Sequence, residues 1–374
     1  MNLKRTYSFA FYFHRYLGLL IGLLLILIGL TGSLLIFERE IENYAIARQF
    51  GSVIPQEQTI SIDLITKIAR STYPDWDIQY LKWSKNSQQP LTLRMTERET
   101  NPNIYMDGDH QVFIDPYTGE VLGDRVERYT YYRFLLNLHY RLFIPGDMGV
   151  YITGIAGLLL LIISATGIYL WPGWRRLVSG FKIKIKASVK RANYDIHKVV
   201  GIIAAVFLLI IALTGVCWNF EGITYPVINA VTFSPETEEI KIPQPQPGQN
   251  MAKPSVILAR AQKALPKMDL EFFSYPYKET DPFYLYGINE ETVTVNPYTA
   301  EVLTVEFPQQ MTLGDRVTNS FFPLHNGAFG GLPTRILYVF IGLSPTVLFL
   351  TGLNMYRLRP PQAIKQPSRE LAER

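Results

Sequence analysis

Four long apolar segments constrain the fold of this 374-residue chain more than any other feature. Each provides about 20 or more mostly uncharged residues, enough for a helix to cross the ~30 Å hydrocarbon core of a bilayer. Only Arg335 interrupts them, near one end of its segment. The sequence therefore predicts a membrane α-helical protein whose four transmembrane helices contain the apolar segments 17–37, 150–171, 199–220 and 332–356.

Lysine and arginine residues predict the orientation. The short connection 172–194 contains seven of them and no acidic residue, and further basic residues lie near both ends of the chain. By the positive-inside rule, both termini and this connection are cytoplasmic, and the segments 38–149 and 221–331 are periplasmic. A cleaved signal peptide is the alternative for the first apolar segment, but the third segment repeats it and cannot be a signal.

This topology divides the chain into parts with predicted boundaries. They are the cytoplasmic N-terminus with the first transmembrane helix (1–37), the first outer domain with an interfacial helix (38–149), the second transmembrane helix (150–171), the basic cytoplasmic loop (172–196), the third transmembrane helix (197–220), the second outer domain (221–331), the fourth transmembrane helix (332–357) and a cytoplasmic tail (358–374).

Each outer segment has the pattern of a small α+β domain. Helical spacing over 61–71 and 255–264 is followed by alternating runs at 78–83, 91–95 and 111–114 in the first segment, and at 270–274, 283–286 and 292–295 in the second. Residues 115–119 have turn chemistry. Asp124 and Asp315 are predicted helix N-caps, and His110 a surface turn residue. The single cysteine, Cys217, excludes an intrachain disulfide.

The two halves of the chain repeat one another. His14, Gly18 and the pair Thr31-Gly32 return 183 residues later as His197, Gly201 and Thr214-Gly215. DPYTGEVL at 115–122 returns as NPYTAEVL at 296–303. His139 and Thr166-Gly167 likewise correspond to His325 and Thr351-Gly352. The sequence therefore predicts two parallel repeats of a transmembrane helix, an outer domain and a second transmembrane helix.

Four of the five histidines belong to this repeat. An ionisable residue in or near a membrane span is costly and is by default a functional candidate, although one at a helix end can also extend into water. The topology places His14 and His197 toward the cytoplasmic face, and His139 and His325 toward the outer face. Two neutral imidazoles without further ligands suit the axial positions of a haem iron, whereas zinc usually needs three or four protein ligands.

The Thr-Gly pairs add a second geometric expectation. Thr31 lies 17 residues after His14, which is about 25 Å along a helix. Each membrane level is therefore predicted to hold two histidines from one pair of helices and two Thr-Gly pairs from the other pair.

Residues beside the first histidine pair are further candidates. Gly18 and Gly201 lie four residues after their histidines, where a porphyrin can approach the backbone or, alternatively, where two helices can pack closely. Arg15 and Lys198 directly follow the histidines. They are predicted either to pair with haem propionates or to be ordinary positive-inside anchors.

Several stretches resemble the PepSY-associated transmembrane helix family. They are HRYLGLLIGLLLILIGLTGSLLIFERE and HKVVGIIAAVFLLIIALTGVCWNFEG at the repeat openings, LHNGAFGG, and the span endings TGIYLW and TGLNMY. The resemblance covers nearly the whole chain, with Tyr356 standing where Trp171 ends the second span. It implies PepSY-like outer domains.

Members of this family include inner-membrane ferric-siderophore reductases of the FoxB type. The resemblance implies two haem b groups with His14, His197, His139 and His325 as iron ligands. Electrons would pass from the cytoplasmic side to a periplasmic ferric siderophore or other ferric chelate, releasing Fe(II). Because no nucleotide-binding motif occurs, the donor is expected to be a separate flavin, flavoprotein or quinol. Membrane lipid is the other expected partner, and no nucleic acid is expected.

Two other classes of protein remain open at this point. One is a non-redox membrane protein whose PepSY-like domains bind or regulate a peptidase or another partner. The other is a transporter built from parallel repeats, which would normally contain broken helices or acidic residues in mid-membrane. The haem absorption spectrum distinguishes the reductase from both.

Overall fold

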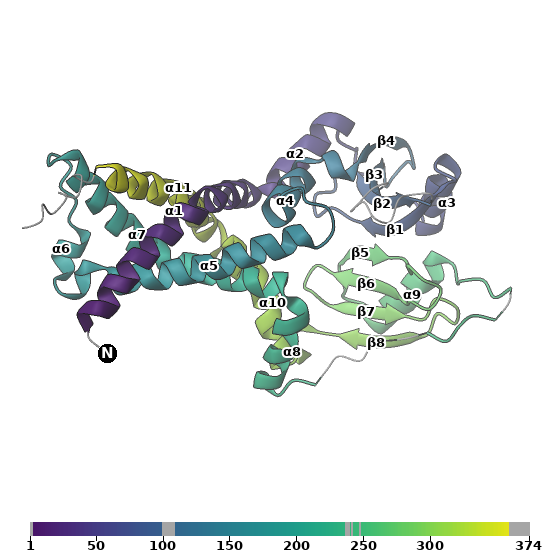
Figure 1. Ribbon diagram of the computed structural model, residues 1–374. Coiled ribbons are helices and arrows are strands. Elements are labelled where there is room, and N and C mark those ends of the chain that lie inside the picture. Colours follow the sequence, from purple (N-terminus) through teal and green to yellow (C-terminus); the bar gives the residue numbers. More distant parts are fainter. Residues whose placement is uncertain (1–2, 99–108, 236–239, 241, 247, 359–374) are drawn as a thin grey trace, which may run out of the picture. The chain divides into compact units, whose positions relative to one another are not determined.

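The computed structural model describes residues 3–98, 109–235, 240, 242–246 and 248–358 (Figure 1). The chain divides into two compact units. Within the described residues, the first unit contains 3–33, 155–216 and 325–358, and the second contains the remainder. The predicted cytoplasmic tail lies outside the described residues except for Leu358.

The first unit is built around long helices. They are α1 (Leu3–Leu35), α5 (Met148–Leu170), α7 (Val189–Asn219) and α11 (Gly331–Arg357). In the described part of the chain, these are the four helices long and apolar enough to cross a membrane, as predicted. The chain is therefore a multi-pass membrane protein. Both α1 and α7 begin earlier than their apolar segments, so His14 and His197 lie inside helices.

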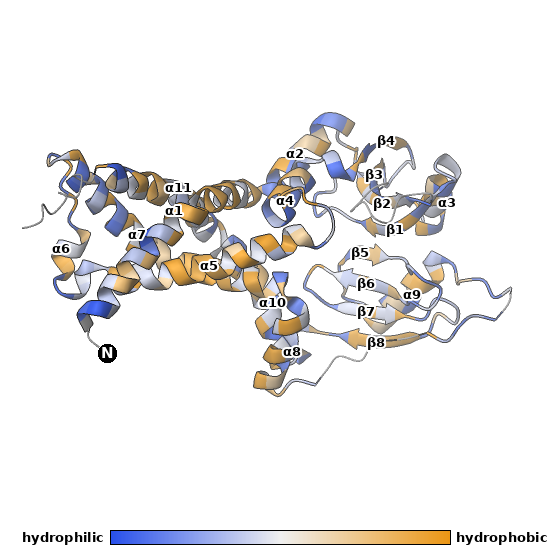
Figure 2. Ribbon diagram, in the orientation of Figure 1, coloured by the Kyte–Doolittle hydropathy of each residue, from blue (hydrophilic) through white to orange (hydrophobic). Residues whose placement is uncertain are grey.

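Small residues allow the helices of this unit to approach closely. A Cβ at Gly22 of α1 would overlap the Phe349 ring of α11, and one at Gly29 would overlap the Gly342 carbonyl. The Ser33 hydroxyl donates a hydrogen bond across the same contact to the Val339 carbonyl at 3.0 Å. Such contacts replace the hydrophobic effect, which does not drive association between helices in lipid. Figure 2 shows that α5 and α11 consist largely of hydrophobic residues.

The connection between α5 and α7 is folded. It contains the 3₁₀ turn η2 (Pro172–Trp174) and the short helix α6 (Leu177–Phe181). The buried Trp171 ring packs edge-on against Trp174 and Phe181, with centroid distances of 5.4 and 5.2 Å. Gly173 and Gly180 lie so close to this ring that a Cβ at either would overlap it.

The second unit contains one eight-stranded antiparallel sheet with the order β4-β3-β2-β1-β5-β6-β7-β8. The joint between β1 and β5 pairs Leu81 with Phe273. Each outer segment thus supplies four strands to one continuous sheet, whereas the sequence had suggested a small sheet in each. The strands are β1 (Trp76–Lys82), β2 (Leu91–Glu97), β3 (Asp109–Ile114), β4 (Val121–Val126), β5 (Leu270–Ser274), β6 (Phe283–Gly287), β7 (Thr292–Val295) and β8 (Val302–Glu306).

Two helices pack on one face of this sheet and share its hydrophobic core. They are α3 (Ile62–Thr72) and α9 (Pro254–Ala264), which agree with the predicted helices to within a residue or two. Ser61 caps α3 by accepting a hydrogen bond from the Leu64 N–H at 3.3 Å. The Asp63 carboxylate accepts hydrogen bonds from the backbone and hydroxyl of Ser255 at 2.8 and 2.5 Å, which links the two helices.

Further helices complete this unit, and two predicted caps are wrong. Asp124 lies within β4, and the cap of α4 is Thr130, whose hydroxyl accepts from the Arg133 N–H at 3.2 Å. Asp315 lies inside α10, where it forms a reciprocal capping box with Thr312. The helices are α2 (Glu38–Phe50), α4 (Tyr131–Arg141), α8 (Glu221–Thr232) and α10 (Leu313–Asn326), with the short turns η1 (Glu127–Tyr129) and η3 (Pro308–Gln310). A further short turn, η4 (Ala328–Gly330), belongs to the first unit.

The predicted turn after β3 is confirmed, and the second half contains the same turn after β7. Asp115 Oδ1 accepts hydrogen bonds from the backbone N–H groups of the residues two and three positions later, and Asn296 does the same. Gly119 closes the first turn at a φ of +81°, and Ala300 takes the corresponding position at +54°. The repeated DPYT and NPYT motifs are therefore structural.

Candidate functional site

The structure brings together the first predicted histidine pair. His14 comes from α1 and His197 from α7, and both belong to the first unit. Their ring centroids are 6.3 Å apart, and the ring planes are nearly perpendicular at 88°.

Each histidine is held by a threonine. His14 Nδ1 lies 3.0 Å from the Thr166 hydroxyl oxygen and 3.1 Å from the Ile163 carbonyl oxygen. His197 Nδ1 lies 2.9 Å from the Thr351 hydroxyl oxygen. The predicted arrangement of two histidines from one helix pair and two Thr-Gly pairs from the other is confirmed at this level.

These contacts assign the proton on each imidazole ring. The hydroxyl proton of each threonine is donated to the carbonyl four residues earlier in its own helix, at 2.9 Å for Thr166 and 2.7 Å for Thr351. Each hydroxyl oxygen therefore accepts a hydrogen bond from Nδ1–H, so the lone pair lies on Nε2. Neither Nε2 has a hydrogen-bond partner among the described residues.

The glycine after each threonine makes room for the ring. A Cβ at Gly167 would lie 3.2 Å from His14 Cε1, and one at Gly352 would lie 3.6 Å from His197 Cε1. We call this arrangement the His–Thr–Gly contact: Nδ1–H donates to the threonine, and the imidazole edge lies against the glycine.

A third His–Thr–Gly contact involves His325, at the end of α10. Its Nδ1 lies 2.9 Å from the Thr214 hydroxyl oxygen, and Thr214 donates to the Ile210 carbonyl at 2.9 Å. A Cβ at Gly215 would lie 3.2 Å from His325 Cε1. His139 lies on α4 in the second unit. Its pairing with His325 stays a prediction.

The donor set at His14 and His197 fits haem iron better than an isolated metal ion. The described residues contain no group of three or more histidine, cysteine or acidic side chains placed to hold a metal. A metal–imidazole bond is about 2 Å long and the ring centre lies about 1 Å further, so two axial imidazoles have centroids about 6 Å apart. The 6.3 Å separation agrees with this value. Edge-to-face packing spans the same range, but it does not require the matched Nδ1 hydrogen bonds.

The two cations beside this pair differ. The Arg15 guanidinium lies 4.8 Å from the Tyr16 ring and 4.6 Å from the Tyr356 ring. Its Nε and Nη1 are buried without a hydrogen-bond partner among the described residues. Lys198 Nζ instead pairs with Asp195 Oδ1 at 2.7 Å and donates to the Ser179 carbonyl at 3.0 Å. Arg15 therefore has donors available for an acidic group, whereas the Lys198 charge is already paired.

The two candidate glycines also differ. A Cβ at Gly18 would meet no atom within 4 Å, so Gly18 does not mediate close helix packing; Gly22 has that role. A Cβ at Gly201 would make an ordinary contact with Leu348 at 3.6 Å. Of the two, Gly18 fits the approach of a planar ligand.

The fifth histidine is not the surface turn residue that the sequence predicted. His110 lies in β3, is 9% exposed, and stacks on Trp76 with a centroid distance of 3.9 Å. Its ring nitrogens face Glu97 at 3.1 Å and Asp124 at 3.4 Å. These contacts tie together the strands of the first half of the sheet.

Comparison with known proteins identifies the family of this chain. The model of the family described as the PepSY-associated TM region matches residues 11–359, a range that contains the four repeated histidines. No curated protein matches the chain. Because the match extends over far more than half of the sequence, the chain belongs to the PepSY-associated TM region family.

Proposed function

We propose that this protein is a di-haem b reductase of the bacterial inner membrane. It passes electrons from the cytoplasmic side, where both termini lie, to a periplasmic ferric siderophore, and the iron leaves as Fe(II). The observation that carries the proposal is the His–Thr–Gly contact, because it leaves Nε2 of a neutral imidazole available at His14 and His197.

At the inner level, His14 and His197 would hold the haem iron. Thr166 and Thr351 keep the required tautomer and fix the planes of the two rings. Arg15 would bind a propionate with its unpartnered Nε and Nη1. Haem bound between these residues would supply a one-electron carrier whose potential depends on ligation, burial and hydrogen bonding.

At the outer level, His325 would pair with His139. The support is that Thr214 and Gly215 hold His325 with the same contacts that the inner histidines have. Two levels also suit the distance to be crossed, because one cofactor would leave a wide gap across a ~30 Å hydrocarbon core.

The electron balance requires a donor and two acceptors. A reduced flavin, a flavoprotein or a quinol gives up two electrons and releases two protons. Each ferric chelate takes one electron, so one donor molecule yields two Fe(II) ions.

Purified full-length protein tests this proposal. We expect the absorption spectrum of b-type haem, two haems per chain by the pyridine haemochromogen assay, and Fe(II) release when the reduced protein meets a ferric siderophore. His197→Ala should lose one haem, and the control His110→Ala should keep both. Protein without haem, or unchanged stoichiometry in His197→Ala, would refute the assignment.

A further inference from the structure

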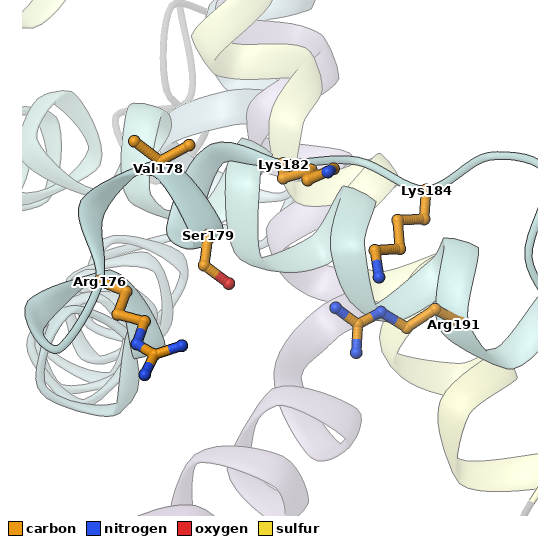
Figure 3. A pocket seen from close by; sticks show the side chains of 6 residues that line it. All are labelled: Arg176, Val178, Ser179, Lys182, Lys184 and Arg191. Atoms are coloured by element: carbon orange, nitrogen blue, oxygen red, sulfur yellow. The ribbon is translucent and has the colours of Figure 1, made fainter.

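A basic pocket lies in the connection between α5 and α7. It has a volume of about 380 Å³ and is shown in Figure 3. Four of its six lining residues are cations and none is acidic. The lining residues are Arg176, Val178, Ser179, Lys182, Lys184 and Arg191.

One buried carboxylate gives this pocket its shape. Asp195 is fully buried, and its Oδ2 accepts from the Lys184 backbone N–H at 3.2 Å and from Arg191 Nε at 3.0 Å. Its Oδ1 pairs with Lys198 Nζ, which in turn donates to the Ser179 carbonyl. The carboxylate therefore connects α7 to both sides of the pocket, and the Trp171 packing described above supports the same connection.

The charge within the pocket is not balanced by the protein. The single negative charge of Asp195 is shared between Arg191 and Lys198. Among the described residues, Arg176, Lys182 and Lys184 have no carboxylate within ion-pair distance. In Figure 3 the Lys184 ammonium and the Arg191 guanidinium point toward one another. Like charges directed at one place repel unless an anion lies between them.

We propose that this pocket binds a phosphate group. Arginine binds phosphate through paired N–H donors and lysine through a compact charge, and the Ser179 hydroxyl is a further donor on the pocket wall. Basic pockets beside transmembrane helices bind phospholipid headgroups in the same way. Val178 and Ile185 are 83% and 76% exposed, so apolar surface lies close to the cations.

Two sources can present this phosphate. One is the headgroup of an anionic phospholipid, and the other is the phosphate ester of a soluble electron donor, namely reduced flavin mononucleotide. The second source rests on the proposed function, whereas the first does not. Both require the same cations.

Binding to the full-length protein tests the site with a matched pair of variants. Arg176→Ala/Lys184→Ala removes two cations that line the pocket, and Lys186→Ala/Lys190→Ala removes two exposed cations from the same segment that do not line it. Flavin mononucleotide is compared with riboflavin by fluorescence titration. Phosphatidylglycerol is compared with phosphatidylcholine by retention in native mass spectrometry.

We expect the pocket variant to weaken binding of a phosphate-bearing ligand about tenfold or more, and the control variant by no more than about threefold. Preference for flavin mononucleotide over riboflavin identifies the donor as the source, and preference for phosphatidylglycerol identifies lipid. Equal losses in both variants, or no binding of either ligand, would overturn the proposal. Neither measurement depends on haem, so failure of the proposed function appears separately as a missing haem spectrum. Unchanged thermal unfolding confirms that both variants fold.

Discussion

Replacing Gly167 by alanine tests the His–Thr–Gly contact directly, and Gly352→Ala is its matched control. The new Cβ at Gly167 would lie 3.2 Å from His14 Cε1, so the imidazole must move by a few tenths of an ångström. The new Cβ at Gly352 would lie 3.6 Å from His197 Cε1, which is an ordinary contact. Both glycines are near the ends of transmembrane helices and gain up to about 1 kcal/mol of helix stability on substitution. The comparison therefore isolates the contact with the histidine.

The expected effect follows from the displacement of a proposed iron ligand. Changes in groups that orient a metal ligand typically cost about 10- to 100-fold in affinity, which is about 1.4–2.7 kcal/mol. Because the His14 ring is displaced but not removed, we expect Gly167→Ala to weaken haem binding at the inner level about tenfold. Gly352→Ala should change it by less than about twofold, since no atom has to move.

Haem titration of each purified variant measures this difference, and electron paramagnetic resonance of the ferric protein reports the angle between the axial rings. We expect Gly167→Ala to depart from the nearly perpendicular 88° arrangement and Gly352→Ala to retain it. Equal haem affinity and equal spectra in the two variants would show that the glycine does not position the ligand. A larger effect in Gly352→Ala would contradict the geometry.

Three further predictions use other contacts. Thr351→Val removes the hydroxyl acceptor of the His197 Nδ1–H but leaves the Leu348 backbone as a partner, so the cost is about 0.5–1.5 kcal/mol and inner haem retention should fall. The control Thr346→Val, whose hydroxyl is already unpartnered, should not change it. Asp195→Asn should lower the free energy of unfolding by about 3–5 kcal/mol because Lys198 is left buried without its charge partner, and adding Lys198→Met should recover part of this loss in thermal unfolding. Burial raises the pKa of Tyr275 from 10 to about 12. The neutral phenol therefore contributes about 2–3 kcal/mol to the free energy of unfolding below pH 10, and this contribution is lost between pH 10 and 12. Tyr275→Phe should flatten the decline of stability in that range, and an unchanged slope would contradict the assignment.

Much of the secondary structure could be predicted because burial leaves a periodic pattern. The four membrane helices and six of the eight strands follow apolar segments or strict alternation. The two missed strands, β4 and β8, are the edges of the sheet. Neither contains a buried residue: one residue of each is exposed and the others are half-buried. In β4, Asp124 followed three residues later by Glu127 favoured a helix cap over a strand. Because no residue of these two strands is buried, burial imposes little alternation on their sequences.

The differences between the two cations at the site could not be read from the repeat alone. Arg15 and Lys198 occupy equivalent positions, each directly after a histidine. The environments of the two cations differ because Asp195 lies three residues before Lys198 on the same helix face. At the equivalent position before Arg15 the sequence has Tyr12. The acidic residue three positions away was the available signal.

Each half of the chain builds its own His–Thr–Gly contacts but only part of a ligand pair. His14 is held by Thr166 of the first half, and His197 and His325 are held by threonines of the second half. The proposed ligand pair at the inner level nevertheless joins the two halves, because His14 faces His197. A single half would therefore orient one histidine at this level correctly and have no second ligand for the opposite side. In the proposed di-haem protein, duplication supplies the second ligand with its orienting contacts already in place, which would explain why the threonines and glycines are repeated together with the histidines.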